Sequence, residues 1–262
     1  MTPVLESRAL GINFGGLVAV DAVDMSLAPS EILCIIGPNG AGKSTLFNLI
    51  SGIYKPTQGQ VLLNGRTISG WPAHRIAAAG IARTFQSSRL FNELTLIDNI
   101  VIGMHTRTSS GVLDALLLPR RARAELDAAA ERAGTLLRMV SEELFERRHT
   151  LAGALPQADR RRLEIARCLA SDPKVIMLDE PSSGMDDRDT DALIDDIRRM
   201  MTEREGLSFL IIEHDMRLVA TLPDRVMVID YGRKIADGDF TEVRRMPRVQ
   251  EAYLGKKAAR HA

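Results

Sequence analysis

The chain has 262 residues, of which 45% are hydrophobic and 26% charged, a composition typical of soluble globular proteins. Lysine plus arginine and aspartate plus glutamate each number 34, so the net charge gives no indication of a nucleic-acid partner. No apolar run approaches the roughly 18 residues of a membrane-spanning helix, and the N-terminus does not resemble a signal peptide. Cys34 and Cys168 lack the spacing of a metal site, and we expect both to be buried apolar residues in a reducing cytoplasm.

The N-terminal third of the sequence is rich in predicted strands. Residues 4–14 and 18–27 alternate in polarity around a Gly15-Gly16 turn, and residues 60–65 form a further strand closed by a turn. This alternation indicates antiparallel pairing. Phe14 has two interpretations here: its ring stacks on an adenine base, or it packs as an ordinary strand residue.

A glycine-rich segment fits the phosphate-binding template G-x-x-x-x-G-K-[ST]. It follows a predicted buried strand at residues 32–36, precedes a predicted helix, and reads Gly37-Pro38-Asn39-Gly40-Ala41-Gly42-Lys43-Ser44-Thr45. The glycines let the backbone N–H groups approach phosphate oxygens, and the helix N-terminus adds partial positive charge. We expect Lys43 to reach the β- and γ-phosphates of a nucleotide and Ser44 to hold Mg²⁺.

The middle of the chain changes character. Residues 74–80 are predicted as a helix and residues 81–86 as a strand, whereas residues 87–170 show little strand pattern. Residues 121–140 are predicted as a helix with one apolar face, made by Leu126, Ala129, Ala130, Ala133, Leu136, Leu137 and Val140. We therefore predict a helical subdomain inserted at residues 87–170 into an α/β fold.

The α/β pattern returns in the last third. Strands are predicted at residues 175–180, 207–212 and 225–229, a helix at 186–201, a hairpin at 232–238 and closing helices at 240–254. The first of these strands ends in Asp179 and Glu180 at the sheet edge where ligands bind. Asp179 can hold a water on Mg²⁺, and Glu180 can act as general base toward the attacking water. The alternative, two acidic residues that complement a helix dipole, is less favoured beside a phosphate-binding loop.

These motifs occur in the same order as in the ATP-binding subunits of ABC transporters, which the chain resembles from Phe14 to its C-terminal tail. Residues 37–45 are similar to the Walker A motif, Asp179-Glu180-Pro181 to Walker B with its catalytic glutamate, and residues 182–186 to the D-loop. Phe14 is similar to the adenine-stacking aromatic, Gln86 to the Q-loop glutamine and His214 to the switch histidine. Outside this series of motifs, Gln86 would be read more simply as a surface glutamine and His214 as a core histidine.

The resemblance implies ATP and Mg²⁺ as cofactors, with Ser44, Gln86 and Asp179 near the metal. It implies Lys43, Glu180 and His214 as the catalytic residues, His214 by bonding the γ-phosphate. Gln86 would also contact the attacking water and report the nucleotide state to the helical subdomain. It further implies a single domain over residues 1–262, whose core and antiparallel β subdomain comprise residues 1–86 and 171–262.

One motif departs from the family pattern Leu-Ser-Gly-Gly-Gln. Counting back from residues 162–167, which match the stretch after it, places the signature at Leu155-Pro156-Gln157-Ala158-Asp159. In the family, this signature caps the γ-phosphate of ATP held by the other subunit, and here proline removes an N–H while two side chains replace glycines. Asp159 either brings a carboxylate near that phosphate or favours a helix N-terminus. We therefore expect a second, non-identical ATPase partner with an intact signature.

Several stretches resemble branched-chain amino acid importers in particular, namely residues 14–20, 83–86, 162–167, 212–216 and 252–255. That resemblance implies two ATPase subunits, two transmembrane permeases, an external solute-binding protein and a place on the cytoplasmic face of the membrane. Leu90-Phe91 and residues 94–96 either contact the permeases or form the core of the helical subdomain. The alternatives are an ABC ATPase outside transport, a nucleotide-binding regulatory subunit with little ATPase activity, and, least favoured, a kinase.

Overall fold

The computed structural model describes residues 2–84, 90–104 and 119–254, which form two compact units. We call the first the sheet unit; it comprises residues up to 83, residues 174–183 and those from 205. The second, the helical unit, comprises residues 84–173 and 184–204. Gln86 lies outside the described residues.

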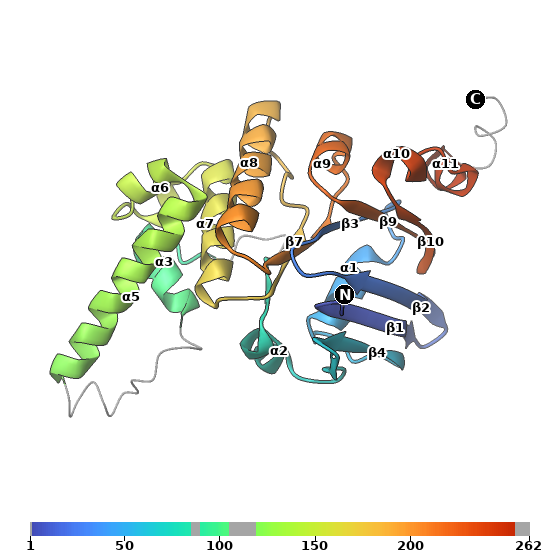
Figure 1. The fold of residues 1–262 in the computed structure, drawn as a ribbon, viewed down its shortest axis with the longest axis horizontal. Helices are drawn as coiled ribbons and strands as arrows, with labels where there is room; N and C mark the ends of the chain where they lie inside the picture. The colour runs from blue at the N-terminus through green and yellow to red at the C-terminus, as the bar shows by residue number, and fades with distance from the viewer. Residues whose placement is uncertain (1, 85–89, 105–118, 255–262) are drawn as a thin grey trace. The chain divides into compact units, whose positions relative to one another are not determined.

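A six-stranded sheet runs through the sheet unit in the order β10-β9-β3-β8-β7-β6 (Figure 1). Strands β9, β3, β8, β7 and β6 are parallel, and β10 is antiparallel to β9. Strands β3, β7 and β8 are buried at every position, because their sequences are almost entirely apolar. The bounds are β3 Ile32–Ile36, β6 Ile81–Arg83, β7 Val175–Asp179, β8 Ser208–Ile212, β9 Arg225–Asp230 and β10 Arg233–Gly238.

A second, antiparallel sheet has the order β2-β1-β4-β5, as the alternating sequences predict. Its strands are β1 Leu5–Phe14, β2 Leu17–Leu27, β4 Gln58–Leu63 and β5 Arg66–Thr67. Apolar residues of both sheets and of helix α1 (Lys43–Ile50) form one buried cluster. The other helices of this unit are α2 Ala73–Ala79, α9 Met216–Thr221, α10 Phe240–Val243 and α11 Pro247–Leu254.

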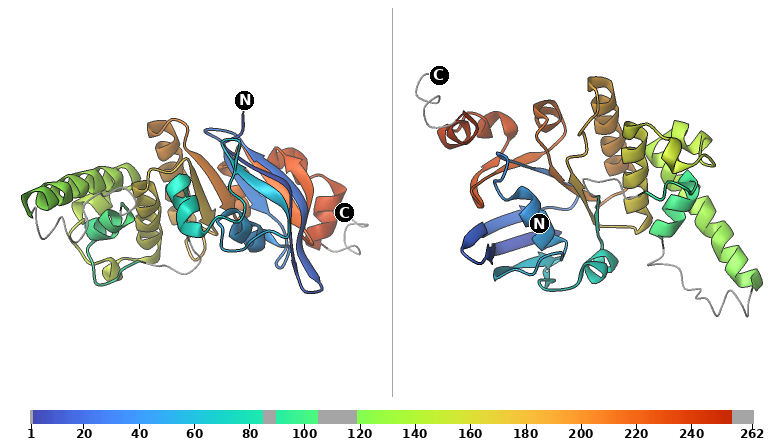
Figure 2. Two further views of the ribbon diagram at one scale, coloured as in Figure 1. Left: turned by 90° about the horizontal axis from the view of Figure 1, so that it is seen from below. Right: turned by 180° about the vertical axis from the view of Figure 1, so that it is seen from behind.

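The helical unit is built around the long helix α5 (Pro119–Val140), which contacts α3, α6, α7 and α8 (Figures 1 and 2). Thr95 begins α3 with a capping box, because its hydroxyl accepts the Asp98 N–H while the Asp98 carboxylate accepts the Thr95 N–H. The remaining bounds are α3 Leu96–Gly103, α6 Glu142–Glu146, the 3₁₀ turn Ala152–Ala154, α7 Gln157–Ala170 and α8 Asp187–Glu203.

Two details differ from the sequence-based expectation. Leu126 is 61% exposed, so the apolar face of α5 is buried only from Ala129 onward, where α5 has neighbours to pack against. The helical unit is also larger than residues 87–170, since it includes α8. Helix α8 contacts α5, and its buried Asp196 accepts a 2.8 Å hydrogen bond from Arg162 of α7.

The two cysteines differ in burial, since Cys34 is fully buried in β3 and Cys168 is partly exposed. Among the described residues, no helix is both long and apolar enough to cross a membrane.

Candidate active site

The phosphate-binding segment lies between buried strand β3 and helix α1, and its shape requires glycine at two positions. Gly37 and Gly42 have φ of 152° and 101°. A Cβ at Gly37 would lie 2.0 Å from the Ile229 carbonyl oxygen, and one at Gly42 would lie 2.5 Å from that of Ala19. The loop therefore passes in direct backbone contact with β9 and β2, which leaves no room for side chains there.

Lys43, the first residue of α1, is only 8% exposed. Its Nζ donates hydrogen bonds to the carbonyl oxygens of Gly37 at 2.6 Å and Pro38 at 3.0 Å. Burial lowers the pKa of Lys43, while the carboxylates of Glu180 and Asp179 act in the opposite direction. The ammonium group thus lies inside the loop, close to two carboxylates, at the position where phosphate oxygens are bound in such loops.

Asp179 ends strand β7 and is anchored by an arginine that the sequence analysis assigned no role. Arg83 donates from Nη2 to the Asp179 Oδ2 at 2.9 Å, and both side chains are more than nine-tenths buried. The same guanidinium donates to Asn48 of α1 and to Ser51, the residue directly after this helix, and lies 5.4 Å from the Phe47 ring centroid. Arg83 therefore fixes the end of β7 to the helix that follows the phosphate-binding loop.

Glu180 and His214 follow neighbouring parallel strands and lie close together. The Glu180 Oε1 is 3.8 Å from the His214 Nδ1, and the His214 side chain is 59% exposed. Glu180 has a left-handed φ of 48°, a conformation that costs a non-glycine residue energy and is concentrated at functional sites. Its N–H donates to the Ile212 carbonyl oxygen at 2.9 Å, which ties it to the end of β8.

Phe14 ends strand β1 with its side chain outside the core. The residue is 45% exposed, and its ring meets Tyr54 edge to face, with centroids 5.4 Å apart and planes at 77°. Packing inside a sheet core therefore does not explain this aromatic. Tyr54, which sequence reasoning did not identify, braces the ring and leaves it accessible.

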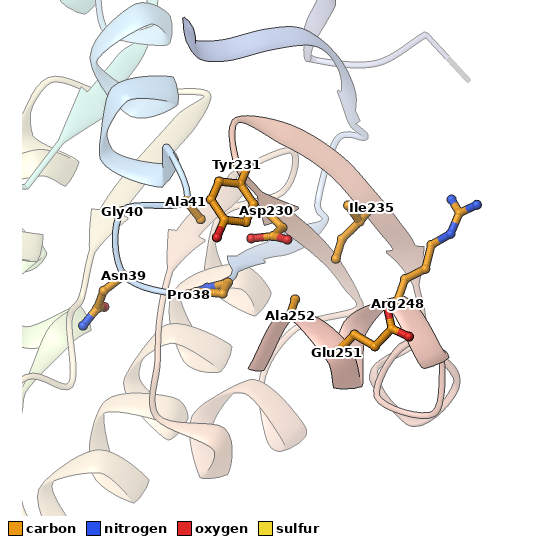
Figure 3. Close-up of a pocket in the computed structure, with 10 residues that line it drawn as sticks. All are labelled: Pro38, Asn39, Gly40, Ala41, Asp230, Tyr231, Ile235, Arg248, Glu251 and Ala252. Atoms are coloured by element: carbon orange, nitrogen blue, oxygen red, sulfur yellow. The ribbon is translucent and has the colours of Figure 1, made fainter. Parts of the chain in front are cut away.

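An open cavity of about 490 Å³ lies beside the phosphate-binding loop, between this loop and helix α11 (Figure 3). Pro38, Asn39 and Ala41 line one side of it, while Arg248 and Glu251 of α11 lie on the other side. Burial raises the pKa of the Tyr253 phenol on the same helix to about 12, and a hydrogen bond with the Gly37 backbone opposes that shift. Helix α11 thus lies beside the phosphate-binding loop.

The degenerate signature lies in the helical unit, where Pro156 precedes α7. Leu155, Ala158 and Asp159 are buried, whereas Pro156 and Gln157 are exposed. The Asp159 carboxylate, in the first turn of α7, lies 3.4 Å from both Arg147 and Arg162. This geometry favours the helix N-terminus interpretation of Asp159, because the carboxylate is paired within its own unit.

The fold and these residues define a class of protein: a P-loop nucleotide-binding ATPase in which carboxylate-bearing strands end next to the loop. Mg²⁺ fits the donor set, because the exposed Ser44 hydroxyl and the buried Asp179 carboxylate supply the oxygen ligands that this ion prefers.

Comparison with known proteins gives the family. Residues 20–183 match the model described as ABC transporter, so the chain belongs to the ABC transporter family and is an ABC-type ATPase. Residues 233–259 match the model described as branched-chain amino acid ATP-binding cassette transporter.

The similarity extends over nearly the whole chain. It is 41% identical over 254 residues to the high-affinity branched-chain amino acid transport ATP-binding protein LivG of Escherichia coli K12, spanning 97% of this chain and 98% of LivG. BraF of Pseudomonas aeruginosa, a protein of the same description, is 40% identical over the same shares of both chains. Two solved ATP-binding cassettes of ABC transporters, one nucleotide-free and one in an ADP conformation, each give a TM-score of 0.83 at 29% identity. They cover 97% and 98% of this chain, respectively, and 100% of their own.

Proposed function

We propose that this chain is the ATP-hydrolysing subunit of an importer for branched-chain amino acids or a related amide such as urea. The observation that carries the proposal is identity of 41% over nearly the full length to proteins described as acting in high-affinity branched-chain amino acid transport. The match of the C-terminal segment, residues 233–259, to the corresponding model supports it. The solute itself does not contact an ATPase subunit, so the chain's own residues do not select it.

In this proposal the phosphate-binding loop and Lys43 hold the ATP phosphates, and Phe14 stacks on the adenine. Ser44, Asp179 and Gln86 would hold Mg²⁺, which would neutralise negative charge on the phosphates when bound. Arg83 keeps the Asp179 carboxylate in place through its 2.9 Å ion pair. Binding in this loop orients the terminal phosphate toward the ends of β7 and β8.

Glu180 would accept a proton from the attacking water, and His214 would bond the γ-phosphate. The 3.8 Å separation between their side chains supports a shared role at one phosphate. Phosphoryl transfer needs positioning and charge stabilisation more than covalent chemistry from the protein. These residues can therefore suffice for hydrolysis once a partner closes the site.

We further propose that the partner ATPase is a different chain, because residues 155–159 lack the serine and both glycines of the family signature. Two permeases and an external solute-binding protein would complete the importer, with this subunit on the cytoplasmic face. Leu90 and Leu96 are buried in the helical unit, but Phe91 is 49% exposed and is the better candidate for a permease contact.

The test is ATP hydrolysis by the purified chain, alone and with a second ATPase encoded beside it. We expect slow turnover alone and a large increase with the partner. Glu180→Gln should abolish the increase while ATP still binds, and Lys43→Ala should weaken ATP binding. Full, cooperative turnover by the chain alone would contradict the heterodimer.

A second candidate function is a regulatory subunit that binds ATP with little hydrolysis. The same experiment separates the two. If this chain is regulatory, Glu180→Gln should leave the activity of the complex unchanged, because its own site would contribute no turnover.

A further inference from the structure

Glu213, the residue directly after strand β8, is a fully buried carboxylate with 0% exposure. It directly precedes His214, and its side chain reaches the segment that carries Glu180. Its Oε1 accepts a hydrogen bond from the Ser182 N–H at 2.8 Å. Its Oε2 accepts from the N–H groups of His214 at 2.9 Å and Asp215 at 3.2 Å.

These three bonds explain how the carboxylate is tolerated in the interior. A buried carboxylate is costly unless hydrogen bonds compensate it, and bonds from backbone N–H groups to a charged acceptor are about twice as strong as neutral ones. The apolar Ile211 and Ile212 directly before it are equally buried, so packing alone does not require a carboxylate here. The reason for an acidic residue at this position is the set of N–H groups that it binds.

The bonds join the two catalytic segments beyond the point where the sheet ends. Strands β7 and β8 pair as far as Asp179 and Ile212, and the next backbone bond runs from the Glu180 N–H to Ile212. The Glu213 carboxylate then continues this connection from Ser182 to His214. Both residues that it steadies require support, because Glu180 has a left-handed backbone and the His214 side chain is mostly exposed.

We propose that Glu213 is a positioning residue for ATP hydrolysis, which holds Glu180 and His214 at a fixed separation by bridging the backbones that carry them. This inference rests on the proposed catalytic roles of these two residues. A displacement of about 1 Å at a reacting group can cost on the order of 100-fold in rate. A link of this kind therefore acts on turnover rather than on nucleotide affinity, since the phosphate-binding loop does not depend on it.

The test is Glu213→Gln in the full chain with its partner ATPase. The amide has the same shape, but its NH₂ group faces N–H donors and cannot accept from them, so one side of the bridge is lost. We expect kcat to fall at least tenfold while KM for ATP stays within about threefold. A kcat within twofold of the unchanged protein would overturn the inference, as would an equal loss of ATP affinity.

Glu31→Gln is the matched control. Glu31 also accepts a backbone N–H, that of Ala28 at 2.6 Å, and it pairs with Arg225, but it precedes β3 at the opposite end of the sheet. The same chemical change there should leave kcat within twofold. If both variants lose activity equally, the effect is general destabilisation and the inference fails.

A double-mutant cycle tests whether Glu213 and His214 act together, which a purely structural role of Glu213 would not produce. If Glu213 acts partly by placing His214, Glu213→Gln should cost at least threefold less in a His214→Ala background than in the unchanged protein. If the two substitutions instead reduce kcat by independent factors, the positioning role is overturned. If His214→Ala and Glu180→Gln both retain full activity, the proposed site itself fails, which is a different outcome from failure of Glu213→Gln alone.

Should Glu213→Gln fail to fold, Glu213→Asp retains the charge with a side chain one methylene shorter, too short to reach both segments. The folded Asp variant should show the same fall in kcat at nearly unchanged KM. Unchanged kcat in that variant would equally overturn the inference.

Discussion

Arg83 shows how a single side chain can connect two elements of a nucleotide site, the end of β7 and helix α1. It bonds Asp179 at the end of β7, Asn48 in α1 and Ser51 directly after α1, and its Cζ lies 5.4 Å from the Phe47 ring centroid. A lysine could not reproduce this set, because its ammonium lacks the planar fork that bonds several partners at fixed angles. The contacts of Arg83 therefore contribute to folding stability as well as to the geometry of the site.

Arg83→Met should therefore destabilise the protein strongly. Removing one partner of a buried ion pair leaves the other charge uncompensated, at a typical cost of about 3–5 kcal/mol. Urea unfolding measures the change. Arg8→Met is the control, because Arg8 also pairs with a carboxylate, that of Glu6, but on the exposed surface, and this variant should unfold near the same urea concentration as the wild-type protein. Equal destabilisation by the two variants would contradict the special role of Arg83.

The two thiols should react slowly in the folded chain, even though Cys168 is partly exposed. Burial raises the pKa of Cys34 well above its ordinary value of 9.0 and that of Cys168 to about 12, and only the thiolate attacks a thiol reagent. At about pH 8, a chromogenic disulfide should label both cysteines slowly in the native protein and rapidly in urea. Fast native labelling of either cysteine would show that its thiol is not protected in this way.

The same shifts give a pH dependence of stability. Between pH 9.0 and about 12 the unfolded chain loses thiol protons that the folded chain retains, so this contribution to stability decreases as pH rises through that window.

At the scale of elements, the central strands were predictable because each is a short, continuous apolar run, a pattern that indicates a buried strand. The apolar runs at residues 32–36, 175–179 and 208–212 are buried along their whole length, as central parallel strands require. The glycine pattern likewise fixed the position of the loop before α1. In contrast, Leu126 looked like part of an apolar face, yet no periodicity reveals that α5 extends past the other described helices at that end (Figure 1).

The contacts that support the site could not be predicted in the same way. Arg83 and Asp179 are 96 residues apart in sequence, and Glu213 and Ser182 are 31 apart. Only the order of strands in the sheet brings these residues together, and sequence alone did not establish which strand ends are neighbours. Gln86 lies outside the described residues, so its role stays a prediction from the motif series.

The signature lies at the start of helix α7, and restoring the family's residues there would test its role. Pro156→Ser with Gln157→Gly restores a hydroxyl, an N–H and a close backbone approach, and leaves the paired Asp159 intact. If the signature limits turnover, this double variant should raise ATP hydrolysis by the isolated chain. Adding Asp159→Gln should raise it further but lower the unfolding midpoint, because Arg147 and Arg162 lose their buried carboxylate.

A steady-state ATPase assay and urea unfolding, run on the same preparations, separate these two effects. Glu143→Gln serves as a control at an exposed carboxylate that also pairs with Arg147, and it should change neither quantity. No gain in hydrolysis by either repaired variant would mean that another feature limits the isolated chain.

At the scale of the whole molecule, the intact Walker residues and the altered signature predict an asymmetric assembly. In the proposed assembly, each composite site would pair the phosphate-binding loop of one subunit with the signature of the other. Two copies of this chain would form two sites capped by Pro156 and Gln157, whereas a partner with an intact signature would form one complete site over this chain's loop. ATP should therefore stabilise the mixed dimer in preference to the homodimer.

Glu180→Gln tests this preference, because loss of the general base should trap ATP without abolishing its binding. With ATP, light scattering coupled to gel filtration should show the variant as a monomer when alone and as a one-to-one dimer when mixed with the partner ATPase. Lys43→Ala in the same chain should weaken dimer formation, since ATP held by the loop joins the two surfaces. A stable ATP-dependent homodimer of the Glu180→Gln chain would contradict the asymmetric assembly, because residues 155–159 would then close a site as well as an intact signature does.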